Sequence, residues 1–557
     1  MQNTTLTLLS AAQIEDFYKS GVWRKDTIYS LARLHAEATP DAPAIRDRQR
    51  TLTYRELLEA ADRLAAKLHE AGVRPGQRVG LWASSRVESA VVLLACCRNS
   101  YTCCPSLHRD HTVADVLALM GRTGAAAFIG EVNYGGDVQK TDIFSRLSSI
   151  ESMKFVLRLG KVDEADADGG LLSKFPTPAT VPEPSSDPNR VVYLAFTSGT
   201  TGEPKGVMHS DNTLLSNARA IAADWTFGRD SVIYTMSPLS HNLGFGALIS
   251  SILVGAQLIV HDLPRGASVL DRFLETHTTF IFGVPTHAID LLNELKARGL
   301  SQVGALKGFR ISGAAAPKEV VASLLQHGVV PQSGYGMTEA CSHHYTLPND
   351  DVRRITETSG KACPGYEVKI WSTENPDKEL PVGEIGQIGG RGGSLMLGYF
   401  DDQCATERSF NAHGWFMTGD LGKLDADGYV VITGRKKDLI IRGGHNIYPA
   451  QMENLAMQHP AVARAAALPV PDPRFGEKVC IAVMLRPGSQ IRADELLDHL
   501  AASGLSRYDM PEYFLQLEEI PLTASGKLFK RDLVETIKAG RLQPVAVRWR
   551  PGIEEVA

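Results

Sequence analysis

The sequence predicts an α/β fold with more than one domain, and three observations support this. The chain has 557 residues, more than a single hydrophobic core usually supports. Helical periodicity alternates with short apolar runs through residues 28–130 and again through residues 191–313, a rhythm typical of layered α/β sheets. Residues 365–435 change to short strand-like runs divided by Gly and Asp turns. We therefore expect a large N-terminal domain of two doubly wound α/β subdomains plus a small β-barrel, followed by a smaller α+β C-terminal domain.

The first α/β segment contains examples of both element types. Its pattern predicts helices at residues 57–71 and 87–97 and strands at residues 78–83 and 125–129. The pairs Cys96-Cys97 and Cys103-Cys104 flank apolar runs without the CxxC spacing of metal ligands. We interpret them as small core residues.

The second α/β segment begins at Val191. Apolar runs predict strands at residues 191–196, 232–236, 257–260 and 279–283. The longest apolar stretch, residues 245–260, is too short to cross a bilayer and carries several polar residues and glycines. It indicates a buried helix that runs into a buried strand.

Composition and charge restrict the function classes. With a formal net charge of -5, the chain lacks the excess of basic residues that is typical of a nucleic-acid-binding protein. The N-terminus has no basic segment followed by an apolar core, so we expect no secretory signal. Eight cysteines in such a chain are typical of reduced thiols in a cytosol. We expect a cytoplasmic protein that acts on small molecules, with no nucleic-acid partner and no integral membrane segment.

The most distinctive segment is TSGTTGEPKG at residues 197–206, directly after the apolar run 191–196. Its glycines permit close backbone approach to an anion, and its hydroxyls and lysine add donors and positive charge. The spacing is not that of a Walker A loop, and the composition alone is also typical of a flexible turn. The candidate phosphate-binding residues are Thr197, Ser198, Gly199, Thr200, Thr201, Gly202 and Lys205.

Four further segments follow this loop. They are GYGMTE at 334–339, GWFMTGDL at 414–421, GRKKDLIIRGGHNIYP at 434–449 and PLTASGK at 521–527. With these motifs the chain resembles, over about residues 29–533, the adenylate-forming superfamily of acyl-CoA synthetases, carrier-protein adenylation domains and beetle luciferases. It looks most similar to the branch that contains cyclohexanecarboxylate-CoA ligase and medium-chain acyl-CoA synthetases. The resemblance implies ATP, Mg²⁺ and coenzyme A as cofactors.

The resemblance also implies roles at an ATP site. Tyr335 would lie against adenine, Thr338 would bond a phosphate oxygen, and Glu339 would hold Mg²⁺. Asp420 would accept hydrogen bonds from the ribose hydroxyls, with Arg435 as a nearby donor. The other ATP-binding residues are Gly334, Gly336 and Met337 in the same segment and Gly313, Ala314 and Ala315 in the turn SGAAAP.

The chemistry of this superfamily implies two half-reactions on two domains. Residues 1–434 would form the adenylation domain, residues 435–437 a hinge at Lys437, and residues 438–557 a mobile C-terminal domain. Without the resemblance, Lys437 would be interpreted as one of several charged residues in a solvent-exposed segment.

Two sites of the C-terminal domain would serve different steps. Lys527 would be catalytic, stabilising the charge that develops at the α-phosphate, and a lysine acetyltransferase acting on it would switch the enzyme off. Gly443 and Gly444 would let the pantetheine arm of coenzyme A pass, or form a left-handed turn, or both.

The acid site would lie along SPLSHNLGFG at residues 237–246. His241 could act near the carboxylate or only form a pocket wall. The candidate substrate-binding residues are His241, Asn242, Phe245, Gly246 and Gly336. Phe245 and Gly246 suggest an apolar cavity. The resemblance to the branch named above implies a cyclic acid, such as cyclohexanecarboxylate, or a medium-size monocarboxylic acid that is converted to its CoA thioester. An Asn beside the His also fits a salicylate-like aryl acid loaded onto a carrier protein, and a non-catalytic nucleotide-binding member is a third reading.

Overall fold

The structure, a computed structural model, describes residues 7–549 except 138, 163, 165–169, 173–181, 198–203, 265, 314–315 and 522–529. The chain divides into two compact units. Unit 1 comprises Met1–Val368 and Gly390–Phe416, and unit 2 comprises Lys369–Gly389 and Met417–Ala557. The expected hinge at residues 435–437 belongs to unit 2, and its role as a hinge stays a prediction.

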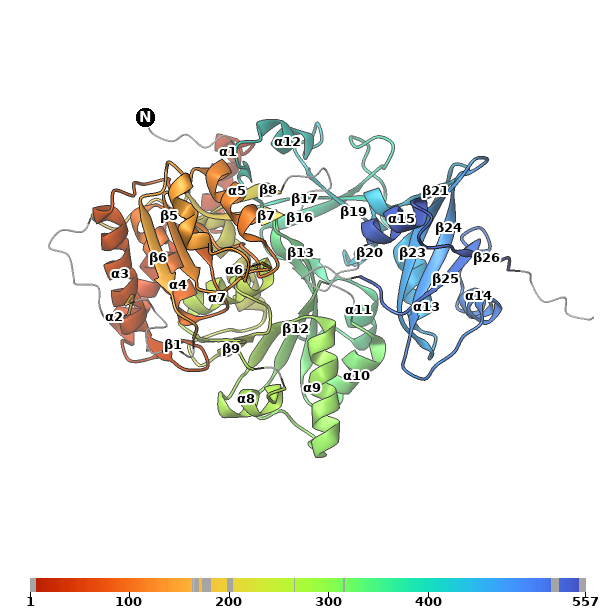
Figure 1. Ribbon diagram of the computed structural model, residues 1–557, viewed down its shortest axis with the longest axis horizontal. Helices are drawn as coiled ribbons and strands as arrows, with labels where there is room; N and C mark the ends of the chain where they lie inside the picture. Colours follow the sequence, from red (N-terminus) through yellow and green to blue (C-terminus); the bar gives the residue numbers. More distant parts are fainter. Residues whose placement is uncertain are drawn as a thin grey trace, which may run out of the picture. The chain divides into compact units, whose positions relative to one another are not determined.

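A nine-stranded sheet forms one half of unit 1 (Figure 1). In spatial order its strands are β15 (Lys361–Ala362), β14 (Cys341–Tyr345), β13 (Val330–Met337), β12 (Gly308–Ser312), β11 (Phe280–Gly283), β9 (Val232–Thr235), β10 (Gln257–Val260), β1 (Pro43–Arg46) and β2 (Thr51–Thr53). The strands from β13 to β1 are parallel, and antiparallel strands complete both edges.

A seven-stranded sheet forms the other half of unit 1. Its order is β18 (Gly398–Tyr399), β8 (Lys205–Ser210), β7 (Val191–Thr197), β4 (Thr102–Cys104), β3 (Arg78–Trp82), β5 (Ala127–Glu131) and β6 (Phe155–Leu159). The strands from β7 to β6 are parallel, whereas β7, β8 and β18 pair antiparallel.

Helices bury the faces of both sheets. One apolar core joins strands of the two sheets to a shared layer of helices: α2 (Ile28–Ala38), α3 (Tyr54–Glu70), α4 (Val87–Asn99), α6 (Asp211–Asp224) and α7 (Asn242–Val254). The outer face of the nine-stranded sheet is covered by α8 (Val269–Glu275), α9 (Pro285–Arg298), α10 (Lys318–Gln326) and α11 (Val352–Glu357). The outer face of the seven-stranded sheet is covered by α5 (Val113–Thr123) and the 3₁₀ turns η1 (Ile143–Ser145) and η2 (Leu147–Ser149).

The predicted α/β fold is confirmed, but each sheet mixes the two segments that the sequence separated. Strands β1 and β2, from the first segment, pair with β10 in the nine-stranded sheet. Strands β7 and β8, from the second segment, join the sheet of the first. The physical reason is that local periodicity reports which face of a strand is buried and not which strand it pairs with.

Two local predictions are confirmed, one for residues 245–260 and one for the paired cysteines. The stretch 245–260 forms helix α7 and then strand β10. The four cysteines at 96, 97, 103 and 104 are buried free thiols in the core. In the part of the chain that the structure describes, no helix has the length and apolar character needed to span a membrane.

Within residues 365–435, where the sequence predicts the small β-barrel, four strands build one sheet, whereas β18 joins the seven-stranded sheet. The order of the four-stranded sheet is β16 (Tyr366–Trp371), β17 (Gly386–Gly392), β19 (Phe416–Leu424) and β20 (Val430–Arg435).

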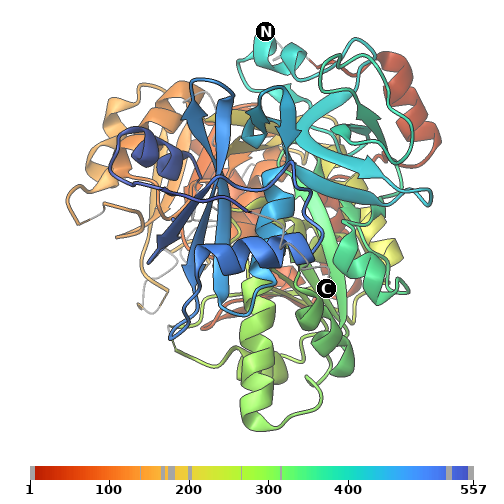
Figure 2. The same cartoon turned by 90° about the vertical axis from the view of Figure 1, so that its right-hand side faces the viewer.

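The rest of unit 2 is an α+β sandwich, whose blue strands form one sheet in Figure 2. Alternate residues of β23 (Val462–Asp472) belong to two cores on opposite faces of this sheet. The other strands are β21 (Ile440–Arg442), β22 (His445–Ile447), β24 (Gly476–Leu485), β25 (Tyr513–Leu517) and β26 (Val545–Ala546). Helices α13 (Pro449–Met457) and α14 (Ala493–Ala502) contribute to one core, and α15 (Lys530–Lys538) contributes to the other.

Candidate functional site

The two ends of the glycine-rich loop are fixed by an antiparallel pair. Thr197 ends β7 and lies opposite Lys205, which begins β8. The backbone N–H of Phe196, next to this end, donates to the Ser106 hydroxyl at 2.6 Å. The predicted phosphate-binding residues 198–202 lie outside the described residues. Thr197 and Lys205 therefore fix where the loop begins and ends.

Tyr399 connects Lys205 to the predicted metal ligand Glu339. The Lys205 ammonium lies 4.6 Å from the centroid of the Tyr399 ring, a cation–π distance. The Tyr399 hydroxyl donates to Glu339 Oε1 at 3.0 Å. Burial, and next the Glu339 charge, raise the pKa of Tyr399 well above its usual value, so the hydroxyl stays protonated and keeps donating.

Strand β13 carries the residues predicted to meet adenine. Tyr335 is buried, and the His343 ring meets it edge-on at 4.8 Å. Gly336 is required by packing, because a Cβ there would lie 2.2 Å from the Cys341 carbonyl oxygen. Gly334 accepts a hydrogen bond at its carbonyl from the Ser312 hydroxyl at 3.1 Å. This contact joins the end of β12 to the adenine segment.

The turn after β13 is held by a buried histidine. His209 Nε2 lies 2.7 Å from the Thr338 carbonyl oxygen, so Nε2 carries the proton and donates. Burial lowers the pKa of His209 to about 4, and the ring is neutral at pH 7. Thr338 is thereby anchored to β8, the strand that begins with Lys205.

The predicted adenine-side turn follows β12 directly. Gly313 has φ +91°, a left-handed conformation that favours glycine. Ala314 and Ala315 lie outside the described residues. The turn therefore starts beside β13, its neighbour in the sheet.

The predicted acid site begins at the N-terminus of α7. The ring of His241, the N-cap residue, stacks on His108 with centroids 4.2 Å apart and planes 12° apart. His108 Nδ1 lies 3.2 Å from the Ser240 hydroxyl. Burial, and next the nearby His241 and His111, lower the pKa of His108 to about 3. His108 is thus a neutral, fixed partner of His241.

A small cavity lies behind this helix end. Its volume is about 20 Å³, and it is lined by Leu214, Asn217, Ala218, Ile221, Asn242, Phe245, Gly246, Ile249, Ser250, Phe282, Cys341 and Ser342. Three predicted substrate residues, Asn242, Phe245 and Gly246, are among them, whereas His241 and Gly336 are not. Asn242 Nδ2 donates to the Met337 carbonyl at 3.3 Å. The cavity wall therefore touches the adenine strand.

Unit 2 carries the predicted ribose and coenzyme A residues. Asp420 and Arg435 face each other across β19 and β20, with Arg435 Nε 3.2 Å from Asp420 Oδ1. Gly443 and Gly444 have φ +59° and +87°, and they form the two-residue turn between β21 and β22. Two consecutive left-handed residues are typical of a type I′ hairpin.

Of the two lysines with predicted roles, the structure describes the hinge residue Lys437 and not the catalytic residue Lys527. Lys437 lies in the 3₁₀ turn η3 (Lys436–Asp438). Burial, and next the Arg435 charge, lower the pKa of Lys437. Lys527 lies outside the described residues.

Sequence reasoning missed three residues of the unit 1 site: Tyr399, His209 and His108. Each is an aromatic or histidine within an otherwise apolar or mixed stretch, without a local feature that separates it from a core residue. Tyr399 reaches Lys205 because the short strand β18 pairs with β8. Tertiary pairing carries that information, and the local sequence does not.

A magnesium ion bound to ATP fits the residues around Glu339. The described residues contain no group of three or more His, Cys, Asp or Glu side chains suited to hold a metal. Mg²⁺ in nucleotide sites typically takes one or two carboxylates, with phosphate oxygens and waters as its other ligands. The half-buried carboxylate of Glu339, which Tyr399 connects to Lys205, meets that requirement.

Comparisons with known proteins agree along the chain. Residues 32–400 match the family described as AMP-binding enzyme, and residues 451–527 match the AMP-binding enzyme C-terminal domain. The chain is 28% identical over 533 residues to the medium-chain fatty-acid–CoA ligase of Escherichia coli (strain K12), covering 95% of this chain and 94% of that relative.

Two further comparisons show the range of relatives. A salicylyl-CoA synthase / salicylate adenylyltransferase of Streptomyces sp. is 29% identical over 536 residues, covering 94% of this chain and 96% of the relative. The crystal structure of ATP-bound MatB from Rhodopseudomonas palustris matches with a TM-score of 0.79 at 28% identity, covering 91% of this chain and 99% of that chain.

Proposed function

Because the chain belongs to the AMP-binding enzyme family of the adenylate-forming superfamily, we propose that it is an AMP-forming acyl-CoA synthetase. In the first step a carboxylate oxygen attacks the α-phosphorus of ATP, which gives an acyl-AMP and releases pyrophosphate. In the second step the thiol sulfur of coenzyme A attacks the acyl carbon, which forms the thioester and releases AMP. The relative named as a fatty-acid–CoA ligase supports this proposal.

The contact series from Lys205 through Tyr399 to Glu339 is the observation that carries the proposal. It brings a cation at the end of the glycine-rich loop to the ring face of Tyr399, and a carboxylate suited to Mg²⁺ to the hydroxyl of the same side chain. A phosphate chain needs both, because cationic groups and the metal neutralise the charge that develops during transfer. No protein nucleophile is required, and positioning supplies the catalysis.

The remaining predicted residues complete the proposal. Asp420 and Arg435 would bind the ribose, and Lys527 would stabilise the developing charge at the α-phosphate. Gly443 and Gly444 would leave room for the pantetheine arm during the second step. The left-handed turn they form is compatible with that role, since the absence of side chains serves both.

The acid that we propose is a cyclic monocarboxylate, such as cyclohexanecarboxylate, or a medium-size one. Support comes from the apolar character of the cavity beside Asn242, Phe245 and Gly246. Its volume of about 20 Å³ suits about one water molecule, whereas benzene occupies an apolar cavity of about 150 Å³. A ring would therefore bind only after side chains of α6 or α7 move.

A salicylate-like aryl acid, loaded onto a carrier protein, is the second candidate. Asn242 lines the cavity, where its amide could meet a ring hydroxyl, and one relative is named as a salicylate adenylyltransferase. The two candidates differ in ring polarity and in the thiol acceptor.

One experiment separates these candidates. Pyrophosphate release is measured with cyclohexanecarboxylate, octanoate, benzoate, salicylate and acetate, each with and without coenzyme A. We expect the fastest release with cyclohexanecarboxylate or octanoate, and thioester formation only when coenzyme A is present. Fastest release with salicylate, without thioester formation, would favour the aryl-acid enzyme. Absence of acid-dependent release across a broad panel would favour a non-catalytic member.

We also propose that acetylation of Lys527 controls the first step. Acetylation removes the positive charge on which the proposed stabilisation depends. Homogeneously acetylated protein should lose pyrophosphate release, and full activity of that protein would rule the proposal out.

A further inference from the structure

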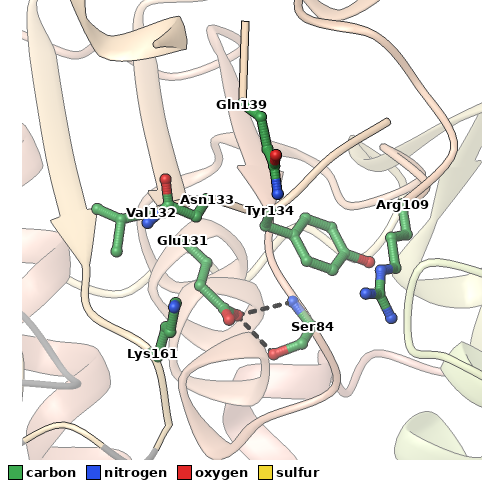
Figure 3. A pocket seen from close by; sticks show the side chains of 8 residues that line it. All are labelled: Ser84, Arg109, Glu131, Val132, Asn133, Tyr134, Gln139 and Lys161. Carbon is green, nitrogen blue, oxygen red and sulfur yellow. Dashed lines mark hydrogen bonds between the residues drawn. The ribbon is translucent and has the colours of Figure 1, made fainter. Parts of the chain in front are cut away.

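A large polar pocket opens in unit 1 outside the residues assigned to the candidate active site (Figure 3). Its volume is about 600 Å³, within the range of small-molecule sites. It is lined by Ser84, Arg109, Glu131, Val132, Asn133, Tyr134, Gln139 and Lys161. Most of these side chains are polar or charged, which favours a polar ligand.

The pocket lies at the ends of two neighbouring strands of the seven-stranded sheet whose connecting segments pack on opposite faces of that sheet. Strands β3 and β5 are parallel neighbours, but their connections lie on opposite faces. Helix α4, after β3, packs in the shared core, whereas α5, before β5, and the turns η1 and η2, after it, pack on the outer face. Ser84 follows β3, and Glu131 ends β5. Open α/β sheets bind ligands in the crevice at the carboxyl ends of neighbouring strands whose connections lead to opposite faces of the sheet.

Two cations contribute positive charge to the pocket. Among the described residues, the side chains of Arg109 and Lys161 have no ion-pair or hydrogen-bond partner. Figure 3 shows them at two ends of the lining, with Glu131 and Tyr134 between them. Such cations favour an anionic ligand. The planar guanidinium of an arginine suits phosphate in particular, because it can donate two parallel hydrogen bonds to phosphate oxygens.

Glu131 presents an acceptor between these cations. Its Oε2 accepts from the Ser84 backbone N–H at 3.0 Å and from the Ser84 hydroxyl, and Arg86 Nη1 lies 3.3 Å away. All three contacts are to Oε2, and Oε1 has no partner among the described residues. A fixed carboxylate at the end of a parallel strand is the kind of group that accepts hydrogen bonds from ribose hydroxyls.

Tyr134 adds a donor to the same wall. Its ring meets Trp82 edge-on at 6.0 Å, which fixes its orientation. Burial raises the pKa of Tyr134 well above its usual value, so the hydroxyl is protonated at neutral pH. The pocket therefore combines cations, a rigid donor and a rigid acceptor.

We propose that this pocket binds a phosphorylated ribose, with phosphate on Arg109 or Lys161 and ribose hydroxyls on Glu131. This site is separate from the residues proposed to bind ATP, and the inference does not rest on the proposed function. The ligand could be a free sugar phosphate or nucleotide, or the phosphorylated nucleoside half of coenzyme A. These sources share one recognition chemistry.

Calorimetric titration of the full chain tests the proposal. Saturating α,β-methylene-ATP is present throughout to fill the proposed ATP site. The titrants are ribose 5-phosphate, 2-deoxyribose 5-phosphate, inorganic phosphate and adenosine 3′,5′-bisphosphate. The double variant Arg109→Ala/Lys161→Ala is compared with Lys296→Ala/Lys318→Ala, which removes the same charge from two exposed lysines. Thermal melting checks that each variant is folded.

We expect wild type and the control variant to bind ribose 5-phosphate equally, and the Kd to rise about tenfold or more in Arg109→Ala/Lys161→Ala. The deoxy sugar and inorganic phosphate should bind more weakly than ribose 5-phosphate. If adenosine 3′,5′-bisphosphate binds more tightly than ribose 5-phosphate, the proposal is supported and coenzyme A is the source of the ligand. If the two bind equally, the proposal is supported with a free sugar phosphate as the ligand. The proposal is overturned by equal binding in wild type and Arg109→Ala/Lys161→Ala, by no binding, or by equal binding of ribose 5-phosphate and inorganic phosphate.

Discussion

Tyr399 uses two parts of one side chain for two charged partners. Its ring face meets the Lys205 ammonium and its hydroxyl meets the Glu339 carboxylate. No motif pointed to this residue, because a tyrosine in an apolar run is most often part of a core. The sequence predicted both charged partners, and the pairing of β18 with β8 supplied the residue between them.

Tyr399→Phe should separate these two contacts. The phenyl ring keeps the cation–π contact with Lys205, but Glu339 loses a hydrogen bond to a charged group, which is worth about 1.5–3 kcal/mol. We expect kcat/KM for ATP to fall about tenfold or more, and the free energy of unfolding to fall by no more than the worth of that hydrogen bond. Steady-state pyrophosphate release measures the effect, with Tyr508→Phe, at a largely exposed position, as control. Unchanged kcat/KM would remove Tyr399 from the site.

His209 should make stability depend on pH. Its pKa is lowered to about 4 in the folded protein, against about 6.5 when unfolded. Below pH 6.5 the unfolded chain therefore takes up a proton that the folded chain does not, and stability falls as pH falls towards 4. At pH 5 the loss from this residue is about 2 kcal/mol.

The variant His209→Gln tests this contribution, because its amide can still donate to Thr338 but cannot titrate. We expect the difference in unfolding free energy between variant and wild type to shift by about 2 kcal/mol in favour of the variant between pH 7.5 and pH 5. Urea unfolding at both pH values measures it. A difference independent of pH would contradict the assignment.

At the scale of elements, periodicity predicted which segments are helices and strands but not which strands pair. The run 191–196 was predicted as a strand, and β7 is that strand. Its antiparallel partner β8 is the next strand along the chain, whereas the other neighbours of this pair, β4 and β18, lie far away in the sequence. Two predicted substrate residues at the start of α7 also differ. The N-cap residue His241 stacks on His108, whereas Asn242, the first residue of the helix, lines the cavity.

Two glycine substitutions should behave oppositely because their elements differ. At Gly336 an alanine Cβ would lie 2.2 Å from the Cys341 carbonyl, which would push β13 from β14. At Gly246 a Cβ meets nothing within 4 Å and lies in helix α7 beside the cavity. Gly336→Ala should lower the urea midpoint and raise KM for ATP, whereas Gly246→Ala should stabilise the protein by up to about 1 kcal/mol and favour smaller acids.

Urea unfolding and the acid panel measure both variants. Each variant is the matched control for the other, since both add one methyl group. Equal destabilisation by the two, or an unchanged ratio of kcat/KM between acetate and cyclohexanecarboxylate in Gly246→Ala, would contradict this account of the cavity.

At the scale of the whole molecule, the motifs predicted the family, and two models of that family match residues 32–400 and 451–527. The acid was harder to predict, because it depends on the shape of a cavity shared by α6, α7, β11 and β14. Relatives at similar identity are named for fatty acids and for salicylate. Motifs that bind phosphates are independent of that shape.

Two half-reactions should be separable by variants of unit 2. We expect Lys527→Ala to lose acid-dependent pyrophosphate release yet still convert supplied acyl-AMP and coenzyme A to thioester. Gly444→Trp should show the reverse, because bulk would block the pantetheine arm. Gly444→Asn controls for backbone strain, since Asn tolerates the left-handed conformation at Gly444.

Separate assays of pyrophosphate release and of thioester formation from synthetic acyl-AMP measure these effects. Equal loss of both steps in Lys527→Ala would count against its assignment. Equal slowing of the second step by Gly444→Asn and Gly444→Trp would attribute the effect to the turn instead of to access.

The pairing of β1 with β10 has a consequence for synthesis of the chain. Ile45 lies opposite Leu258, so the N-terminal strands complete a sheet whose adjoining strand emerges from the ribosome much later. At about 5–20 residues per second, that interval lasts on the order of 10–40 seconds. Until then β1 and β2 have no sheet edge to join, and their apolar residues are available to chaperones. Substitutions there should affect the yield of folded protein more than the activity of molecules that have folded.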